Sequence, residues 1–221
     1  DVYHGRLGAF ALRQVAERVE PTSPPIIKRQ DLQPRAGIYA NVEGRPAGAV
    51  GSVVGQLAKM KGCRAVGIAG GAEKCRYVVD ELGFDACVDY KAGNLWKDIK
   101  AATPQGIDCL FENVGGEIFD ALLGRMNAFS RIALCGLISQ YNSEPHAMKN
   151  VGSVLINRIR MQGFIVSEHM ERWPVALQEL GQGVATGKIK YRETVAQGLE
   201  NAPQAFIGLL KGRNFGKQLV K

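Results

Sequence analysis

The sequence contains no run of about eighteen apolar residues, the length that a helix needs to cross the hydrocarbon core of a membrane. Nor does a basic segment followed by an apolar one, the pattern typical of a secretory signal, come after Asp1. We therefore expect no membrane partner, and a cytoplasmic location is the corresponding hypothesis.

Clustered metal ligands and paired cysteines are missing as well. The chain has three histidines and five cysteines, which are Cys63, Cys75, Cys87, Cys109 and Cys135. Their spacing matches no zinc site, no CxxC redox pair and no dense disulfide framework. We expect no bound metal, and we expect buried free thiols because cysteine packs as a small apolar residue.

The sequence also lacks a stripe of interleaved aromatic and basic residues, although its formal net charge is +7. Residues 186–221 hold seven basic and two acidic side chains, whereas residues 37–185 carry equal numbers of each. A basic excess confined to the C-terminal end argues against a nucleic-acid partner. A nucleic-acid-binding protein remains only as the third alternative.

What the chain does contain, from about Val50 onward, is a regular alternation of short β-rich runs and amphipathic segments. This alternation predicts an α/β fold, a doubly wound parallel Rossmann sheet with helices on both faces. The expected strands are 64–68, 86–89, 108–111, 131–135 and 161–166. The expected helices lie near 51–60, 73–82, 95–102, 118–126 and 172–186.

Three zones follow from this pattern. Residues 1–36 have mixed charges and clustered prolines, and we expect an irregular N-terminal segment there. Residues 37–186 form the predicted Rossmann domain. Residues 187–221 fall outside the alternation and predict a strand, a helix at 202–210 and a last strand at 216–220.

The strongest chemical signal is a short glycine motif made of Gly48, Ala49, Val50 and Gly51. Apolar residues at helical spacing follow it, and the next predicted strand begins soon after Gly62. Glycines there permit a tight turn and a close backbone approach to a pyrophosphate at the helix N-terminus. The motif predicts a dinucleotide site, although a glycine-rich turn without a ligand remains the alternative.

The end of the next predicted strand indicates which dinucleotide is bound. An NAD site commonly has Asp or Glu about 20 residues after the glycine motif, where it accepts hydrogen bonds from the ribose hydroxyls. Residues 69–71 contain no acid, and Lys74 opens the next helix. A 2′-phosphate would meet no repulsion there and would pair with Lys74, which predicts NADP(H). Alternatively, Lys74 is an ordinary solvated helix residue.

Several segments together resemble one family, the zinc-free medium-chain dehydrogenases/reductases, in the branch of prostaglandin reductases and alkenal double-bond reductases. The segments are GAVGSVVGQLAKMKGCRAVGIAGGAEKC, LGFDACVDYK, ENVGGEIFD, ALCGLISQYN, RMQGFIVSEH and LENAPQAFIGLLKGRNFGKQLVK. The resemblance implies an NADPH-dependent oxidoreductase without zinc, which reduces the carbon–carbon double bond of small α,β-unsaturated ketones and aldehydes. It leaves a homodimer open.

The resemblance also implies roles for individual residues. The glycine motif would hold the pyrophosphate, Lys74 and Tyr90 would contact the adenosine side, and Tyr141 is the candidate proton donor. The residues implied for the rest of the cofactor are Asn113, Cys135, Gly136, Ile138, Tyr141, Phe164, Ile165, Val166 and Asn214.

Two departures from the family pattern keep a second function open. The stretch before the glycine motif reads as a poor strand, because Pro46 removes an amide donor and Arg45 is bulky. The family's N-terminal GroES-like substrate domain is not recognisable in residues 1–36. The alternative function is a truncated dinucleotide-binding module that binds NADPH without efficient turnover.

Overall fold

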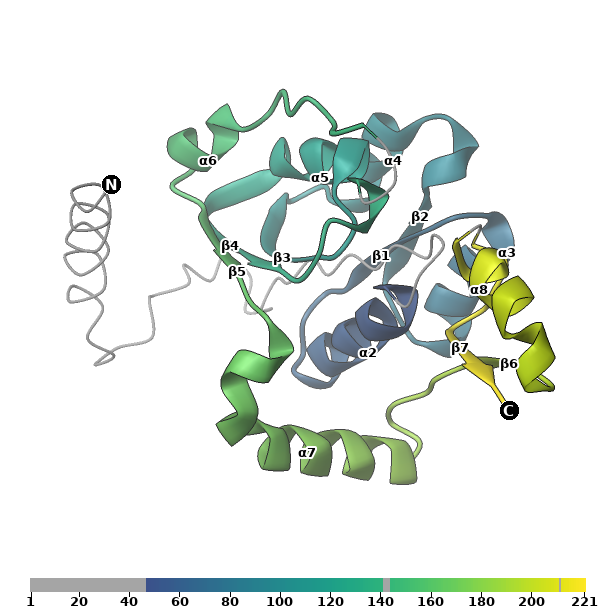
Figure 1. Cartoon of the computed structure of the whole chain (residues 1–221). Coiled ribbons are helices and arrows are strands. Elements are labelled where there is room, and N and C mark those ends of the chain that lie inside the picture. The colour runs from purple at the N-terminus through teal and green to yellow at the C-terminus, as the bar shows by residue number, and fades with distance from the viewer. Residues whose placement is uncertain (1–46, 141–143, 211) are drawn as a thin grey trace, which may run out of the picture. The chain divides into compact units, whose positions relative to one another are not determined.

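A computed structural model describes residues 47–140, 144–210 and 212–221 (Figure 1). All of these residues belong to one compact unit of the chain. The irregular segment predicted at 1–36, residues 37–46 and Tyr141 lie outside the described residues. None of the described helices is long and apolar enough to cross a membrane.

Five parallel strands carry the central part of the fold. They are β1 (Val66–Ala69), β2 (Ala86–Asp89), β3 (Ile107–Glu112), β4 (Met126–Leu134) and β5 (Arg160–Gly163). Strand β1 pairs with β2, and β4 pairs with both β3 and β5, always in parallel. Between the described strands there is no ladder joining β1 to β3. The predicted parallel α/β architecture is confirmed.

Helices connect the strands, as parallel pairing requires. The longer ones are α2 (Ala47–Met60), α4 (Leu95–Ala102), α5 (Gly116–Leu123) and α7 (Trp173–Ala185). The shorter ones are α3 (Ala72–Arg76) with its π-helical continuation η1 (Tyr77–Glu81), α6 (Gly152–Ile156), and the 3₁₀ turns η2 (Tyr90–Ala92), η3 (Ile138–Gln140) and η4 (Val166–Arg172).

Alternation along β1 shows that both faces of the sheet are covered. Val66 and Ile68 belong to the largest core cluster, together with residues of α4 and α5. A side chain at Gly67 would point the other way, where its Cβ would lie 2.8 Å from Val78 of η1. Since neighbouring residues of a strand point to opposite faces, helices pack on each side of the sheet.

The C-terminal segment forms β6 (Glu193–Ala196), the turn η5 (Leu199–Asn201), α8 (Ala202–Leu210) and β7 (Lys217–Val220), and β6 pairs with β7 in parallel. It docks on the Rossmann helices. The buried amide of Gln56 in α2 donates to the Lys190 carbonyl at 2.9 Å and accepts from the Lys190 amide at 2.7 Å. The predicted strand–helix–strand order is confirmed.

Three predicted boundaries were wrong. Helix α2 begins at Ala47, so the glycine motif lies in the first turns of the helix and not in a turn before it. Helix α5 ends at Leu123 and Met126 begins β4, because Met126 pairs with Ile107. Strand β5 ends at Gly163, where the chain turns toward η4. At the second and third boundaries apolar residues lie on both sides, so hydrophobic periodicity could not separate helix from strand there.

The cysteines were predicted to be free and buried. All five are free thiols, but none is buried: Cys109 and Cys135 are exposed, and the other three are partly buried. Cys109 shows the reason, because alternation along β3 turns it away from the face on which Leu110 enters the core cluster.

Replacing Gly55 with Ala should destabilise the fold. Gly55 lies in α2, and an added Cβ would overlap the ring of Phe84, which belongs to a buried cluster. Overpacking of this kind costs about 1–3 kcal/mol of unfolding free energy, which urea denaturation measures. Gly181→Ala in α7 is the matched control. An added Cβ there meets nothing within 4 Å, so we expect a gain of about 0.5–1 kcal/mol. Equal stabilities of the two variants would contradict the packing argument.

Candidate cofactor-binding site

The candidate site lies where the parallel strands end. In open α/β sheets, ligands bind outside the carboxyl ends of the strands. Four residues from the sequence prediction come directly after a strand: Tyr90 after β2, Asn113 after β3, Cys135 after β4 and Phe164 after β5. Because the strands of each sheet are parallel, these residues lie at the carboxyl edge of their sheet.

Two lysines and a phenol surround the end of β1. A Cβ on Gly70 would lie 2.7 Å from the Tyr90 hydroxyl and 2.9 Å from Cε of Lys91, so both side chains pass close to the glycine backbone. Lys74 comes from the first turn of α3, and its ammonium donates to the Gly212 carbonyl at 2.9 Å. We call Gly70, Gly71, Lys74, Tyr90 and Lys91 the lysine corner. Lys91 was missed by sequence reasoning, although it follows Tyr90 directly.

Asp89, the last residue of the neighbouring strand β2, lies beside the lysine corner. Oδ1 of Asp89 accepts hydrogen bonds from the Gly71 amide at 2.8 Å and from the Lys91 amide at 3.0 Å. These bonds tie the turn after β1 to the turn after β2. The sequence prediction considered only residues 69–71 and missed this acid, which parallel pairing of Ala69 with Asp89 brings alongside.

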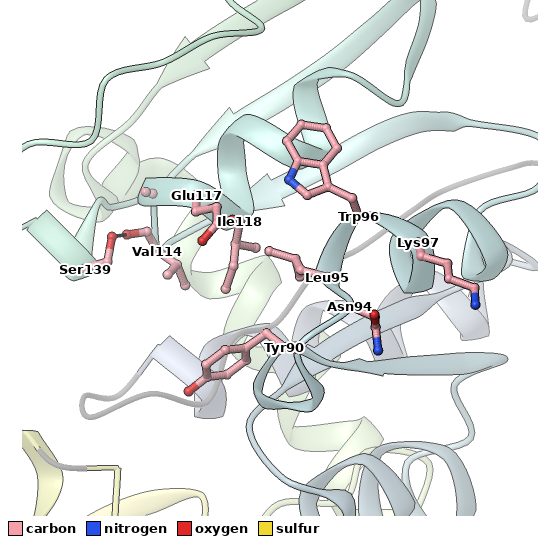
Figure 2. A pocket seen from close by; sticks show the side chains of 12 residues that line it. Tyr90, Asn94, Leu95, Trp96, Lys97, Val114, Glu117, Ile118 and Ser139 are labelled. Atoms are coloured by element: carbon pink, nitrogen blue, oxygen red, sulfur yellow. Dashed lines mark hydrogen bonds between the residues drawn. The ribbon is translucent and has the colours of Figure 1, made fainter.

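A pocket of about 520 Å³ opens next to Tyr90, and Figure 2 shows its side chains. Leu95 of α4 and Ile118 of α5 face each other across it, with Tyr90 on one side. The rest of the lining comes from the first residues of both helices, from Val114–Gly116 and from Ser139. Its lining thus combines apolar side chains with the polar ones of Asn94, Lys97 and Glu117, next to the buried loop Val114–Gly116.

Glu112 organises the loop after β3. Its side chain is buried, and Oε1 accepts from the amides of Val114 at 2.5 Å and Gly115 at 2.8 Å. Burial raises the pKa of this carboxyl, and the hydrogen bonds from the backbone amides oppose that rise. Glu112 therefore holds the backbone of the Asn113–Gly116 loop in place.

The loops after β3 and β4 pack on each other. A Cβ on Gly136 would lie 2.5 Å from Oδ1 of Asn113, so glycine there allows the Asn113 side chain to rest on the backbone. The Cys135 amide donates to the Glu112 carbonyl at 2.7 Å, and the Ser139 amide donates to the Val114 carbonyl at 2.8 Å. The structure thus brings together the predicted residues Asn113, Cys135 and Gly136.

A second pocket, of about 470 Å³, lies beside these loops. It is lined by Leu134–Leu137, Gly163–Ile165 and Glu168. Four residues predicted for the nicotinamide end therefore share one groove: Cys135, Gly136, Phe164 and Ile165. The side chain of Ile165 is 63% exposed, so the groove has an apolar wall that stands in solvent.

The remaining predicted residues lie apart from this groove. Ala49 lines a third pocket, of about 250 Å³, together with Lys74, whereas Val50 is exposed and Gly51 is buried in α2. Ile138 lies in η3 and Val166 begins η4. The side-chain amide of Asn214 donates to the Gly216 carbonyl at 2.7 Å, within the same turn. A role for Asn214 at the cofactor stays a prediction.

Replacing Glu112 with Gln should change how stability depends on pH. A carboxyl whose pKa is higher in the folded chain stabilises the fold below its ordinary pKa of 4.5, and that contribution disappears as pH rises through the folded pKa. Gln keeps an acceptor for the Val114 and Gly115 amides but does not ionise. We therefore expect the unfolding free energy of Glu112→Gln, relative to that of the unsubstituted protein, to increase from about pH 5 to about pH 8.

Urea denaturation at both pH values measures this difference. Glu117→Gln, at an exposed position of α5, is the matched control and should show a much smaller change with pH. A stability difference for Glu112→Gln that stays constant over this range would contradict the expected titration.

No group of three His, Cys, Asp or Glu side chains within 47–140, 144–210 and 212–221 lies close enough to hold a metal ion. The cations that the site does offer are lysine side chains.

Comparison with known proteins places this geometry in a family. Residues 49–182 match the family model described as zinc-binding dehydrogenase. The chain is 47% identical to an NADPH-dependent curcumin reductase of Escherichia coli (strain K12), over 86% of this chain and 56% of the relative. It is 46% identical to an NADP(+)-dependent 2-alkenal reductase of Nicotiana tabacum, over 79% of this chain and 51% of the relative.

A solved structure agrees with these sequence matches. The crystal structure of CurA from Vibrio vulnificus in complex with NADPH superposes with a TM-score of 0.77 and 46% identity, over 86% of this chain and 57% of that one. The chain spans about half the length of the relatives it matches. It belongs to the zinc-binding dehydrogenase family, whose model matches residues 49–182.

Proposed function

We propose that this protein is an oxidoreductase that binds NADP(H) and reduces the carbon–carbon double bond of small α,β-unsaturated ketones and aldehydes. The observation that carries the cofactor proposal is the lysine corner. Lys91 packs against Gly70 at the end of β1, Lys74 comes from α3, the next helix along the chain, and the sequence of the turn itself contains no acid. A 2′-phosphate at this position would gain two charge-assisted contacts.

The shape of the site supports a dinucleotide. The pocket beside Tyr90 includes the apolar side chains of Leu95 and Ile118, which would suit a flat heteroaromatic ring such as adenine. Glycine at 70 and 136 lets Tyr90 and Asn113 pack directly on the backbone at two of the strand ends, which would hold both side chains in place beside a cofactor. The first turn of a helix carries amides that the helix itself leaves without acceptors, and that of α2 would suit a pyrophosphate.

The groove after β4 and β5 is the proposed reaction site. NADPH supplies the hydride when bound, and the β-carbon of the enone accepts it. Phe164 and Ile165 would orient the nicotinamide and exclude water from one side, and Cys135 and Gly136 would border the opposite side. Tyr141, outside the described residues, is the proposed donor to the oxygen on which negative charge develops.

The alternative is a module that binds NADPH without efficient turnover. The exposed wall of the groove favours it, because Ile165 is 63% exposed. A homodimer remains a further proposal about partners.

The two functions separate in one experiment. We expect NADPH fluorescence to saturate on titration with the chain, and concentrated protein with NADPH and an alkenal to form the saturated aldehyde, identified by NMR. NADPH binding without any product would support the binding module. Failure to bind NADPH, or formation of the allylic alcohol through carbonyl reduction, would contradict the proposed function.

A further inference from the structure

The carboxylate of Asp89 joins the two turns that carry the lysine corner. Its Oδ1 atom accepts a hydrogen bond from the Gly71 amide at 2.8 Å and another from the Lys91 amide at 3.0 Å. Gly71 immediately precedes α3, whereas Lys91 lies in η2, the turn after β2. One oxygen atom therefore holds together two turns from separate parts of the chain.

Parallel pairing of β1 with β2 explains why Asp89 can reach both amides. Ala69 pairs with Asp89 as the last residues of the two strands, so the two turns begin side by side. Amides that leave a strand ladder need new acceptors. Asp89 is the N-cap of η2 and accepts from the amide two residues further on, as Asp commonly does in turns. The amide of Gly71, whose φ of 102° favours glycine, uses the same oxygen.

The bond to Lys91 fixes the backbone from which two side chains of the lysine corner project. Tyr90 and Lys91 follow Asp89 directly, and both pass over the end of β1. A Cβ on Gly70 would lie 2.7 Å from the Tyr90 hydroxyl and 2.9 Å from Cε of Lys91. The Lys91 ammonium lies 5.6 Å from the centre of the Tyr90 ring. Asp89 thus sets where this cation and this phenol stand beside the turn that leads into α3.

We propose that Asp89 is a positioning residue for an adenosine 2′-phosphate, because its two hydrogen bonds hold the lysine corner in the arrangement that receives the phosphate. The proposal rests on the proposed function, since it assumes that the 2′-phosphate of NADP(H) binds at the lysine corner. Asp89 acts through Gly71 and Lys91 and itself needs no contact with the phosphate.

The charge of Asp89 by itself disfavours a bound phosphate. A carboxylate and a phosphate are both negative, so their direct interaction is repulsive. An acid in this place therefore helps the site through the geometry that its hydrogen bonds impose. Asparagine offers an acceptor oxygen at the same position without the charge, whereas glutamate keeps the charge and moves the acceptor by one methylene. These two substitutions separate geometry from charge.

Calorimetric titration with two nucleotides tests the proposal. Adenosine 2′,5′-bisphosphate and adenosine 5′-monophosphate differ only in the 2′-phosphate, and neither contains the nicotinamide half of the cofactor. We expect the unsubstituted chain to prefer the bisphosphate. Asp89→Ala should lower that preference about fivefold or more, within the range for loss of a capping side chain, while the affinity for the monophosphate stays nearly unchanged.

Three further variants complete the comparison. Asp89→Asn should keep the preference of the unsubstituted chain, and Asp89→Glu should lower it toward that of Asp89→Ala. Asp80→Ala, at an exposed position of η1, removes the same charge and should bind both nucleotides as before. The Asn and Glu variants carry the test if Asp89→Ala does not fold. A loss of preference in Asp89→Asn as large as in Asp89→Ala would show that the charge acts, which overturns the proposal.

Amide hydrogen exchange, followed by NMR, checks the two hydrogen bonds without any nucleotide. The Gly71 and Lys91 amides should exchange faster in Asp89→Ala than in the unsubstituted chain, and Asp89→Asn should keep them protected. Equal exchange in all three proteins would show that Asp89 does not hold the turns.

The outcomes distinguish this proposal from the proposed function. If the unsubstituted chain prefers the bisphosphate and Asp89→Ala keeps that preference, the positioning role fails while the cofactor proposal stands. If the unsubstituted chain binds both nucleotides equally, the proposed NADP(H) selectivity fails, and the positioning role fails with it.

Discussion

Alkenal reduction by the 221-residue chain is expected to run below ~1 s⁻¹ at saturating NADPH, under the ~1–10³ s⁻¹ typical of enzymes. The reason lies in the groove formed by Cys135, Gly136, Phe164 and Ile165. In its described part, Ile165 on one wall is more than half exposed to solvent. Well-oriented reactants reach effective molarities of ~10⁵ M or more, and an open groove loses most of that advantage.

Steady-state NADPH oxidation at 340 nm, with an alkenal as substrate, measures this rate. NADPH titration on the same preparation is the control, because binding at the lysine corner does not require a closed groove. Turnover at rates typical of enzymes would show that the groove is closed in solution and that this chain is a complete reductase.

Lys74→Ala should weaken NADPH binding by ~1.5–3 kcal/mol, the range for a hydrogen bond to a charged group, and leave NADH binding nearly unchanged. Lys74 stands at the start of α3 beside Gly70 and Gly71, where a 2′-phosphate would be placed. The expected loss corresponds to ~10–150-fold in dissociation constant. Fluorescence titration with each cofactor measures both values.

Lys100→Ala, at an exposed position of α4, is the matched control and should bind both cofactors as before. The Lys74 ammonium also donates to the Gly212 carbonyl, so thermal denaturation should accompany the titrations to check that the C-terminal segment stays docked. Equal affinity of the unsubstituted chain for NADPH and NADH would contradict the selectivity argument. A loss of equal size for both cofactors would show that Lys74 acts on the fold rather than on the phosphate.

Sequence reasoning worked best where the physical cause is local. The alternation of β-rich and amphipathic runs predicted all five described Rossmann strands, and α4 and β2 have the predicted bounds. Boundaries failed where apolar residues continue across them, as between Leu123 and Met126. There, pairing of Met126 with Ile107 decides where the strand begins, and that partner lies nineteen residues away.

The candidate site residues also fall into two groups, those that sequence motifs identified and those that only the fold identified. Lys74, Tyr90, Asn113 and Phe164 could be named from motifs, because each stands in a short segment that resembles a known family. Their partners could not be named. Lys91 enters the site because its stem crosses Gly70, and Asp89 because it bonds to the Gly71 amide.

The amino-acid sequence alone determined the fold class, the dinucleotide motif and the family, since these depend on periodicity and on short runs of residues. Only the tertiary structure decided that Asp89 bonds to the Gly71 amide, that Glu112 is buried under the glycine loop, and that Ile165 stands in solvent. Each of these depends on distances between residues that the chain separates and the sheet brings together. Parallel pairing sets those distances, and no single segment of the sequence encodes them.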